Sequence, residues 1–510
     1  MRRTFAVLIL ILLALTAIRF YLVTKVGIIP DEAYYWTWSL QPDWCYWDQP
    51  PGIAWVHLWW GKLAGDSPAA LHGLALLCSF LASVFSYGLL RQVLGERMAF
   101  WSILATQLVP LFAAGSVLIL HDSLLLVFVP LAWWALVVAI DQDRPHYWLL
   151  VGLVLSCALY AKLSALMLGA GFALAALAHP VGRRHLGTPW PYLGAFLAAV
   201  LFSPVLLWNI KHDAILFYAV DRLSHDPEVV GLQRLLSMLE YLAGQLGVIT
   251  PVLAVLGLIG AGAAIRRRNT EDGRRRLLLA VPALFILIYF WFNSFGAAVQ
   301  ANWPAMAWLA LIPLGLELAA IRKREGRAAF RWALHLGVLL AVTVTVLMHW
   351  QGLSRLYPLP KDITDQFYGW ERLAKRVRIE QANYGPEALM TVRYQIAAEL
   401  VYHLGDRPEV YTIDNAHRGS QFTLWQDYAK LVGQDVLFVD PQLMPGKLAR
   451  HFSSVTELAP FVRRRSGRTV ETLHFYLGRN FHTEGPLAAY FENPVRHQIA
   501  RIKRRQAPPN

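Results

Sequence analysis

The stretch that follows the first apolar segment gathers side chains that can do chemistry. It reads IIPDEAYYWTWSLQPDWCYWDQPPGIAW, from Ile28 to Trp55. Asp31 and Glu32 come directly after the apolar segment, and Asp48 precedes a Gln-Pro-Pro sequence that bars an ordinary helix. A carboxylate at a membrane boundary is costly to bury unless it has a partner or a function. These acids therefore suggest a reaction site, and the alternative is a solvated acidic pair at a helix end.

A further acid and the aromatic rings support a site at the same level. Asp122 lies in HDSLLLVF, at the predicted outer end of an apolar segment. A buried acid there needs a cation, a metal or a proton. The rings of the first stretch, among them Tyr34 and Tyr35, either form an interfacial belt or pack against the faces of a sugar.

Cationic side chains are predicted on the same side of the membrane. Lys162 lies between two short apolar segments, and Lys211, His212 and Arg222 follow a later one. Together they could hold a phosphate near the membrane surface. The alternatives are a snorkelling lysine and an ordinary amphipathic surface helix.

Metal binding stays open at this stage. Asp48 and His57 are candidate ligands for a divalent metal, but their spacing matches no recognised metal motif. No other cofactor is indicated. The three cysteines show no paired spacing, which argues against a disulfide framework or a thiolate site.

The elements that must position these residues are membrane helices. Of the 510 residues 56% are hydrophobic and only 16% are charged, whereas soluble proteins carry about a quarter charged residues. The apolar residues come in blocks of about 20, the length that crosses a bilayer. We expect a polytopic membrane protein with about eleven spans. They are predicted near residues 5–24, 68–90, 99–120, 123–140, 147–161, 163–178, 191–208, 241–265, 277–295, 303–320 and 332–350.

The distribution of basic residues predicts the orientation. The formal net charge is +13, and Lys and Arg gather in short loops such as RRRNTEDGRRR and RKREGR. The positive-inside rule makes that side cytoplasmic, so membrane topology explains the charge and no nucleic-acid partner is expected. The first loop and the 209–240 loop then face outward, in a bacterial inner membrane.

The composition changes near Gln351. ALMTVRYQIAAELVYHLGDRPEVYTID reads as strand, helix and strand, and SQFTLWQDYAKLVGQDVLFVD adds a helix and another strand. We expect two domains: a transmembrane domain over residues 1–350 and an extracytoplasmic α/β domain over residues 351–510.

Carboxylates, cations and aromatic rings at the outer face suit one kind of reaction. Nucleotide sugars are absent outside the cytoplasm, but a sugar on a polyprenyl phosphate stays in the membrane with its phosphate at the interface. A cation would stabilise the departing phosphate, and a carboxylate would accept the proton of the attacking hydroxyl. Direct displacement would invert the anomeric centre. A lipid or sugar transporter or flippase and a scaffolding protein are the alternatives, although a transporter usually places charges at the midplane of repeated halves.

The quoted motifs resemble a known family. DEAYYW followed by YWDQPPG looks like the first outer loop of the GT-C glycosyltransferases, in the group of protein mannosyltransferases and bacterial lipid A aminoarabinose transferases. HDSLLLVF, AKLSALML, PVLLWNIKHD and QANWPAMAW agree in order, and the resemblance covers about residues 1–350. It implies a GT-C fold, a polyprenyl-phosphate sugar donor and an acceptor that is lipid A, another glycolipid or glycan, or a protein.

The resemblance also implies roles for individual residues. Asp31 would be the principal catalytic or acceptor-orienting carboxylate, with Glu32 in support and Asp122 as the second acid. Tyr35 and Lys162 would line the donor phosphate pocket. Two residues match the same pocket less closely: Lys211 and Arg222. The candidates for substrate binding are Tyr34, Asp48, Gln49, His212 and Asn302.

This chain departs from the family pattern at two positions. Gln49 stands where many relatives carry a lysine or histidine, so phosphate binding would depend on Lys162 and Lys211. The second acidic motif usually reads Pro-Asp, and here His121 precedes Asp122. The C-terminal domain, with AHRGSQFTLW, resembles tails of bacterial members, and a stabilising cap is its simplest role.

Overall fold

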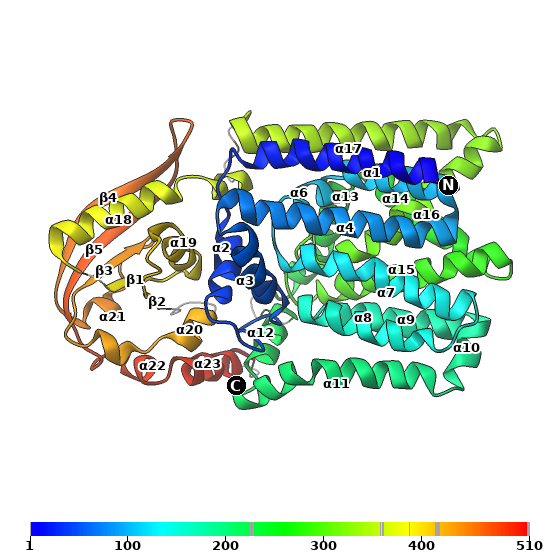
Figure 1. Cartoon of the computed structure of the whole chain (residues 1–510). Coiled ribbons are helices and arrows are strands. Elements are labelled where there is room, and N and C mark those ends of the chain that lie inside the picture. The colour runs from blue at the N-terminus through cyan, green and yellow to red at the C-terminus, as the bar shows by residue number, and fades with distance from the viewer. Residues whose placement is uncertain are drawn as a thin grey trace.

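The computed structural model describes residues 2–224, 226, 229–357, 359, 362–386, 388–413 and 419–506. Figure 1 shows three layers: a bundle of long helices, short helices across one end of it, and an α/β domain beyond them. The bundle contains α1 (Arg2–Val23), α4 (Pro68–Leu94), α5 (Glu96–Leu108), α6 (Pro110–Gly115), α7 (His121–Asp141), α8 (Tyr147–Ala161), α9 (Ala165–Ala178), α10 (Pro180–Leu186), α11 (Trp190–Lys211), α13 (Leu232–Ile249), α14 (Pro251–Arg266), α15 (Glu271–Asn293), α16 (Ala305–Arg324) and α17 (Ala328–Ser354).

Every predicted span is helical, but not every one is a continuous long helix. Within the described residues, seven helices are long and apolar enough to cross a bilayer, or up to nine if each of two bent pairs counts as one span. The pair α13 and α14 bends by 103° just before Pro251. The predicted span 99–120 is interrupted at Pro110, and α8 has only 15 residues. This criterion counts fewer helices than the eleven predicted apolar blocks, because proline and short length break several of these blocks.

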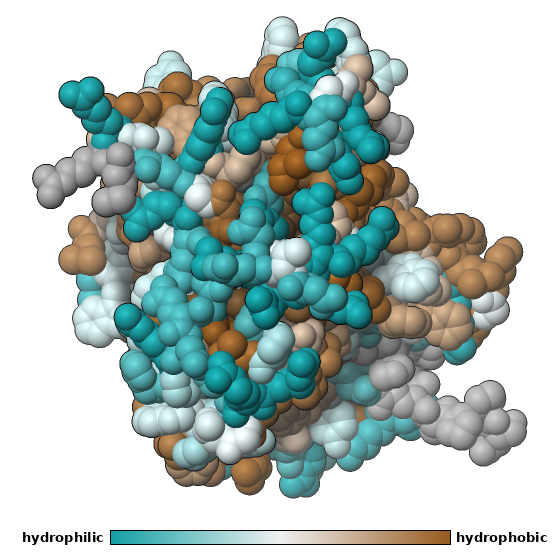
Figure 2. Space-filling view, turned by 90° about the vertical axis from the view of Figure 1, so that its right-hand side faces the viewer, coloured by the Kyte–Doolittle hydropathy of each residue, from teal (hydrophilic) through white to brown (hydrophobic). Residues whose placement is uncertain are grey.

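The middle layer covers the end of the bundle that faces the α/β domain. It consists of α2 (Pro30–Ser39), α3 (Gly52–Ala64) and α12 (Ile215–Ser224), and α2 lies across the ends of the long helices (Figure 1). The opposite end of the bundle carries the crowded hydrophilic side chains seen in Figure 2. Exposed Arg267 and Arg268 follow α14 there, and exposed Lys323 lies in the last turn of α16. This is the basic side that the sequence predicts to be cytoplasmic.

The C-terminal part is a five-stranded mixed sheet with helices on its faces, in the strand order β2-β1-β3-β5-β4. Strands β1, β2 and β3 are parallel, whereas β5 runs antiparallel to β3 and β4. Its elements are η1 (Ile363–Phe367), α18 (Trp370–Tyr384), β1 (Ala388–Thr391), α19 (Tyr394–Leu404), β2 (Val410–Thr412), α20 (Gln421–Trp425), η2 (Tyr428–Leu431), β3 (Val436–Asp440), α21 (Gly446–Ala449), β4 (Phe452–Arg465), β5 (Arg468–Phe481), α22 (Ala488–Glu492) and α23 (Pro494–Gln506). The predicted polytopic helical fold with a C-terminal α/β domain is confirmed.

One hydrophobic core joins the middle layer to the C-terminal domain. Tyr34 and Trp36 of α2 are buried in the same cluster as Ala397 and Leu400 of α19 and Leu437 of β3. The bundle has its own core. Since burial of apolar surface is the main stabilising contribution, this shared core fixes α19 against α2.

Candidate active site

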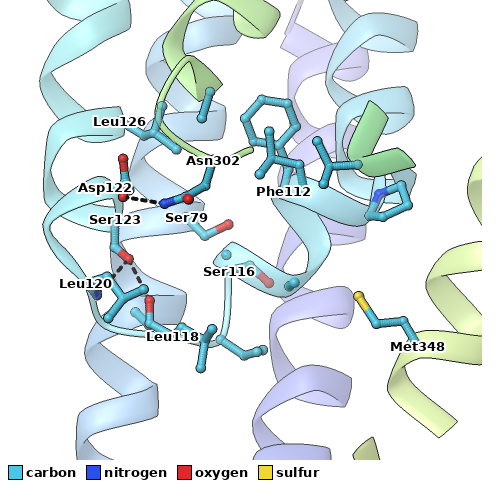
Figure 3. A pocket seen from close by; sticks show the side chains of 18 of the residues that line it. Ser79, Phe112, Ser116, Leu118, Leu120, Asp122, Ser123, Leu126, Asn302 and Met348 are labelled. Atoms are coloured by element: carbon cyan, nitrogen blue, oxygen red, sulfur yellow. Dashed lines mark hydrogen bonds between the residues drawn. The ribbon is translucent and has the colours of Figure 1, made fainter. Parts of the chain in front are cut away.

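A cavity of about 790 Å³ lies at the end of the bundle next to the C-terminal domain. Asp31, Asp122 and Asn302 line it, although they come from three different parts of the chain. Most of its wall is apolar and includes Leu22, Val23, Phe112, Leu126, Leu309 and Met348. Figure 3 shows Asp122 and Asn302 on one side of the cavity and Phe112 and Met348 on another. The cavity thus combines a polar corner with a long apolar surface.

Asp31 reaches the cavity from the first turn of α2. Pro30 is the first residue of that helix, a position where its missing N–H costs nothing. Asp31 follows it, and a negative side chain is favoured there because the first backbone N–H groups point toward it. The sequence Pro-Asp-Glu therefore starts the helix and presents one carboxylate to the cavity.

Glu32 is fully buried and does not line the cavity. Its carboxylate accepts hydrogen bonds from the backbone N–H of Ile29 at 3.1 Å and of Ile119 at 2.8 Å. His72 Nε2 lies 3.5 Å away. Glu32 thus ties the start of α2 to the segment that enters α7. This contact places Asp31 and Asp122 on the same cavity.

Asp122 is the centre of a polar triad. Lys162 Nζ donates to both oxygens of the Asp122 carboxylate, at 2.8 and 2.9 Å, and Asn302 Nδ2 donates at 2.9 Å. Figure 3 shows the contact with Asn302. Lys162 is the residue between α8 and α9, where the chain leaves the helix with extended backbone. Its charge is held against Asp122 in this state, so a phosphate would have to share the ammonium group with that carboxylate.

The turn before α3 packs closely on the same region. A Cβ atom on Gly52 would lie 2.5 Å from the carbonyl oxygen of Tyr160, so only glycine allows this approach of α3 to the end of α8. Asp48, which is 4% exposed, and Gln49 lie in that turn. Gln49 Oε1 and Ser164 Oγ have no hydrogen-bond partner among the described residues. Buried polar groups normally have partners, so these atoms are candidates to contact a ligand.

His57 is buried and neutral. Burial lowers the pKa of His57 to about 3, so its ring adds no positive charge near neutral pH. Its two ring nitrogens also lack hydrogen-bond partners among the described residues. Over the described ranges no group of three or more His, Cys, Asp or Glu side chains could hold a metal ion. Asp48 and His57 therefore do not fit the metal site considered from the sequence, and no step is assigned to a metal.

The described basic side chains near the end of α11 do not line the cavity. Lys211 is exposed at the end of α11, and His212 stacks on Trp208 with ring centroids 3.9 Å apart. Neither residue lines the cavity. The side chain of Arg222 lies outside the described residues. Lys162 is the predicted cation that the structure brings to Asp122.

The two tyrosines that follow Asp31 in α2 contact different parts of the protein. The ring of Tyr35 packs edge-on against His121, with centroids 4.2 Å apart. The hydroxyl of Tyr34 accepts a hydrogen bond of 2.6 Å from the backbone N–H of Gln421 in the C-terminal domain. The Gln421 side chain in turn accepts from the N–H of Trp47 at 2.8 Å. Tyr34 therefore joins the first outer loop to the C-terminal domain and does not line the cavity.

Several residues at the cavity or beside it were not predicted from the sequence. Gln300 and Ser123 line it near Asp122 and Asn302. A polar patch lies on the wall formed by α4 and α5, where Gln107 donates to Ser83 at 2.9 Å and accepts from Arg19 at 2.6 Å. The charged Arg19 within the first apolar segment was the available signal, since ionisable residues within spans often mark functional sites.

Comparisons with known proteins agree with this fold. Residues 48–208 match the family model described as dolichyl-phosphate-mannose-protein mannosyltransferase. The lipid A galacturonosyltransferase RgtD of Rhizobium johnstonii is 25% identical over 380 residues, which cover 74% of this chain and 77% of that protein.

Two solved structures share the fold. They are those of ArnT from Cupriavidus metallidurans bound to undecaprenyl phosphate (TM-score 0.58) and in the apo state (TM-score 0.57). Each is 16% identical to this chain, with 92% of this chain and 97% of ArnT covered.

The fold and these matches define a multi-pass membrane glycosyltransferase and do not support the transporter alternative. These matches support the resemblance to the GT-C glycosyltransferases that the motifs of the first outer loop indicate.

Proposed function

We propose that the protein transfers a sugar, with inversion, from a polyprenyl phosphate to a lipid or glycan of the cell envelope. The observation that carries this proposal is the convergence of Asp31 and Asp122 on one largely apolar cavity. A polyprenyl chain needs an apolar surface, and its phosphate needs a cation at the end of that surface. The ArnT structure with undecaprenyl phosphate supports a donor of this kind, at the level of fold.

The proposed reaction uses Asp31, which lines the cavity, and Lys162, which contacts the lining residue Asp122. In the proposed reaction Asp31 orients the acceptor hydroxyl and accepts its proton, and the sugar moves to that oxygen as the bond from its anomeric carbon to the phosphate oxygen breaks. The phosphate keeps the bonding electron pair, and the ammonium group of Lys162 stabilises its added charge. Asp122 holds Lys162 in position and itself accepts a hydrogen bond from Asn302. If the acceptor is an ionised phosphate, Asp31 only orients it.

The remaining predicted residues receive supporting roles in the proposal. Glu32 positions the start of α2. Tyr35, Asp48 and Gln49 do not line the cavity and stay proposals for binding the substrates beside it. Lys211, His212 and Arg222 stay proposals for binding outside the cavity, at the membrane surface. We keep the proposed division into a transmembrane domain (1–350) and an extracytoplasmic domain (351–510) in a bacterial inner membrane. The basic end in Figure 2 supports that orientation.

The acceptor and the sugar are proposed from the relatives. Because the similar RgtD is named as a lipid A galacturonosyltransferase, lipid A is the first acceptor to test and galacturonic acid the first sugar. Mannose is the second sugar, after the description of the matching family model.

The test is transfer by the purified protein in detergent or proteoliposomes. Undecaprenyl phosphate carrying either sugar would be mixed with lipid A, and the products analysed by mass spectrometry. We expect a glycosylated lipid from the wild-type protein and a loss of at least about a hundredfold in kcat for Asp31→Asn, the usual cost of losing a general base. A melting temperature close to that of the wild type would show that the variant is folded.

Two results would contradict the proposal. Asp31→Asn with undiminished transfer would remove the role of this residue. Movement of the donor across the proteoliposome membrane without any covalent product would point back to a flippase.

A further inference from the structure

We propose that Tyr394 of the C-terminal domain is a positioning residue for Asp31, so that this domain completes the active site. The inference rests on the proposed function of Asp31. The hydroxyl of Tyr394 donates to Asp31 Oδ1 at 3.4 Å, across 363 residues of sequence. Asp31 lines the cavity and Tyr394 does not, so Tyr394 contacts the carboxylate from outside the cavity wall.

The ring of Tyr394 is fixed independently of its hydroxyl. Tyr394 is buried at 8% exposure, and its ring lies 4.5 Å from that of Tyr34, centroid to centroid. Tyr34 is itself held by the backbone N–H of Gln421. Both rings belong to the core shared by α2 and α19. The phenol is therefore directed at Asp31 by packing, which is how a supporting residue restricts a reactive group.

The length of the contact fits a role in the reaction. At 3.4 Å it is long for a hydrogen bond from a hydroxyl, whose usual length is about 2.7 Å. Hydrogen bonds at reactive groups are often long without substrate and shorten when the substrate is bound. A donor beside Asp31 favours one orientation of the carboxylate, so its loss should lower kcat through that orientation.

A second tyrosine of the same helix provides a matched control. Tyr402 also lies on α19 and packs edge-on against Trp36 of α2, with centroids 4.9 Å apart. Its hydroxyl donates to the backbone oxygen of Asp66 at 2.6 Å and has no contact with the cavity. Tyr394→Phe and Tyr402→Phe therefore each remove one hydroxyl that joins α19 to the N-terminal part of the chain. Only the first removes a contact to Asp31.

The experiment measures kcat, the KM of donor and acceptor, and the melting temperature for both variants. The assay uses the same undecaprenyl-phosphate sugar and lipid A that give product with the wild-type protein. For Tyr394→Phe we expect kcat to fall about tenfold while both KM values and the melting temperature stay near those of the wild type. For Tyr402→Phe we expect wild-type kcat, even if its melting temperature falls.

Two results would overturn the inference while leaving the proposed function intact. One is a wild-type kcat in Tyr394→Phe together with an inactive Asp31→Asn. The other is an equal fall of kcat in Tyr394→Phe and Tyr402→Phe, which would show that both act only through docking of the domain. If the wild-type protein transfers no sugar, or Asp31→Asn is fully active, the proposed function fails first and the inference fails with it.

Discussion

At the scale of single residues, the pair of Lys162 and Asp122 combines a reactive role with a structural one. Both side chains are largely buried, at 11% and 18% exposure. Two charges in such a place stabilise each other, but removing one leaves the other buried without a counter-ion. The same pair can therefore be tested for stability and for transfer separately.

We expect Lys162→Met to lower the free energy of unfolding by about 3 kcal/mol, because Asp122 loses its counter-ion. The double variant Lys162→Met with Asp122→Leu replaces the pair by apolar side chains and should recover most of that loss. It should transfer no sugar. Thermal unfolding in detergent and the transfer assay measure the two effects, and a double variant that stays active would exclude the proposed role of Lys162.

At the scale of elements, glycine sets how closely the bundle helices approach. A Cβ atom on Gly152 of α8 would lie 2.0 Å from the carbonyl oxygen of Gly194 of α11. One on Gly194 would lie 2.2 Å from the carbonyl oxygen of Trp148. Close contact through small residues is a main source of helix association in membranes, where no hydrophobic driving force acts between helices. The pairing of α8 with α11 therefore depends on these two positions.

Gly152→Ala should push α8 and α11 apart and destabilise the protein by about 1–3 kcal/mol. Gly262 of α14 is the matched control, since a Cβ atom there has no neighbour within 4 Å. Gly262→Ala should be neutral or stabilise by up to about 1 kcal/mol, as alanine favours helix. Melting temperatures of both variants in the same detergent decide the question. Equal effects would show that the contact between α8 and α11 is not tight.

At the scale of the whole molecule, a buried acid lies where the C-terminal domain meets the middle layer. Glu399 of α19 is 1% exposed, and its carboxylate is 3.2 Å from His403 Nε2. Burial raises the pKa of Glu399 well above its usual range; Arg463 opposes this shift and Glu32 adds to it. Burial lowers the pKa of His403, so burial favours the neutral form of both side chains. The folded chain therefore holds a proton on Glu399 that the unfolded chain releases.

This raised pKa predicts how stability depends on pH. The stability that comes from the protonated Glu399 is fully present below the pKa of glutamate in the unfolded chain, about 4.3. It is lost as the pH rises from that value toward the pKa of Glu399 in the folded protein. Between pH 5 and pH 8 we expect a loss of at least about 1 kcal/mol from this group. Glu399→Gln should remove the loss, so the variant should gain stability relative to the wild type as the pH rises. Melting temperatures of both proteins across this range isolate Glu399 from His403, and parallel curves would contradict the prediction.

The sequence by itself determined the class of protein and the depth of its charged groups. Apolar block length and the distribution of arginine define the spans and the two ends of the bundle, because transfer into a bilayer depends on composition and length alone. The depth of Asp31, Asp122 and Asn302 follows from these patterns, and so does the strand and helix order after Gln351. Hydropathy does not say how each helix is rotated or which helices are neighbours. For that reason Lys211 and His212 were predicted at the site but do not line the cavity.

Only the tertiary structure decided which side chains meet. Lys162 reaches Asp122 across 40 residues, Asn302 reaches it across 180, and Tyr394 reaches Asp31 across 363. Glu32 shows the same limit, since its buried carboxylate contacts Ile119 and His72 from other parts of the chain. Such contacts depend on how close-packed elements fit together, and no local pattern of residues encodes that fit. The partners of the acids, and the part of the C-terminal domain in the site, were therefore visible only in the folded chain.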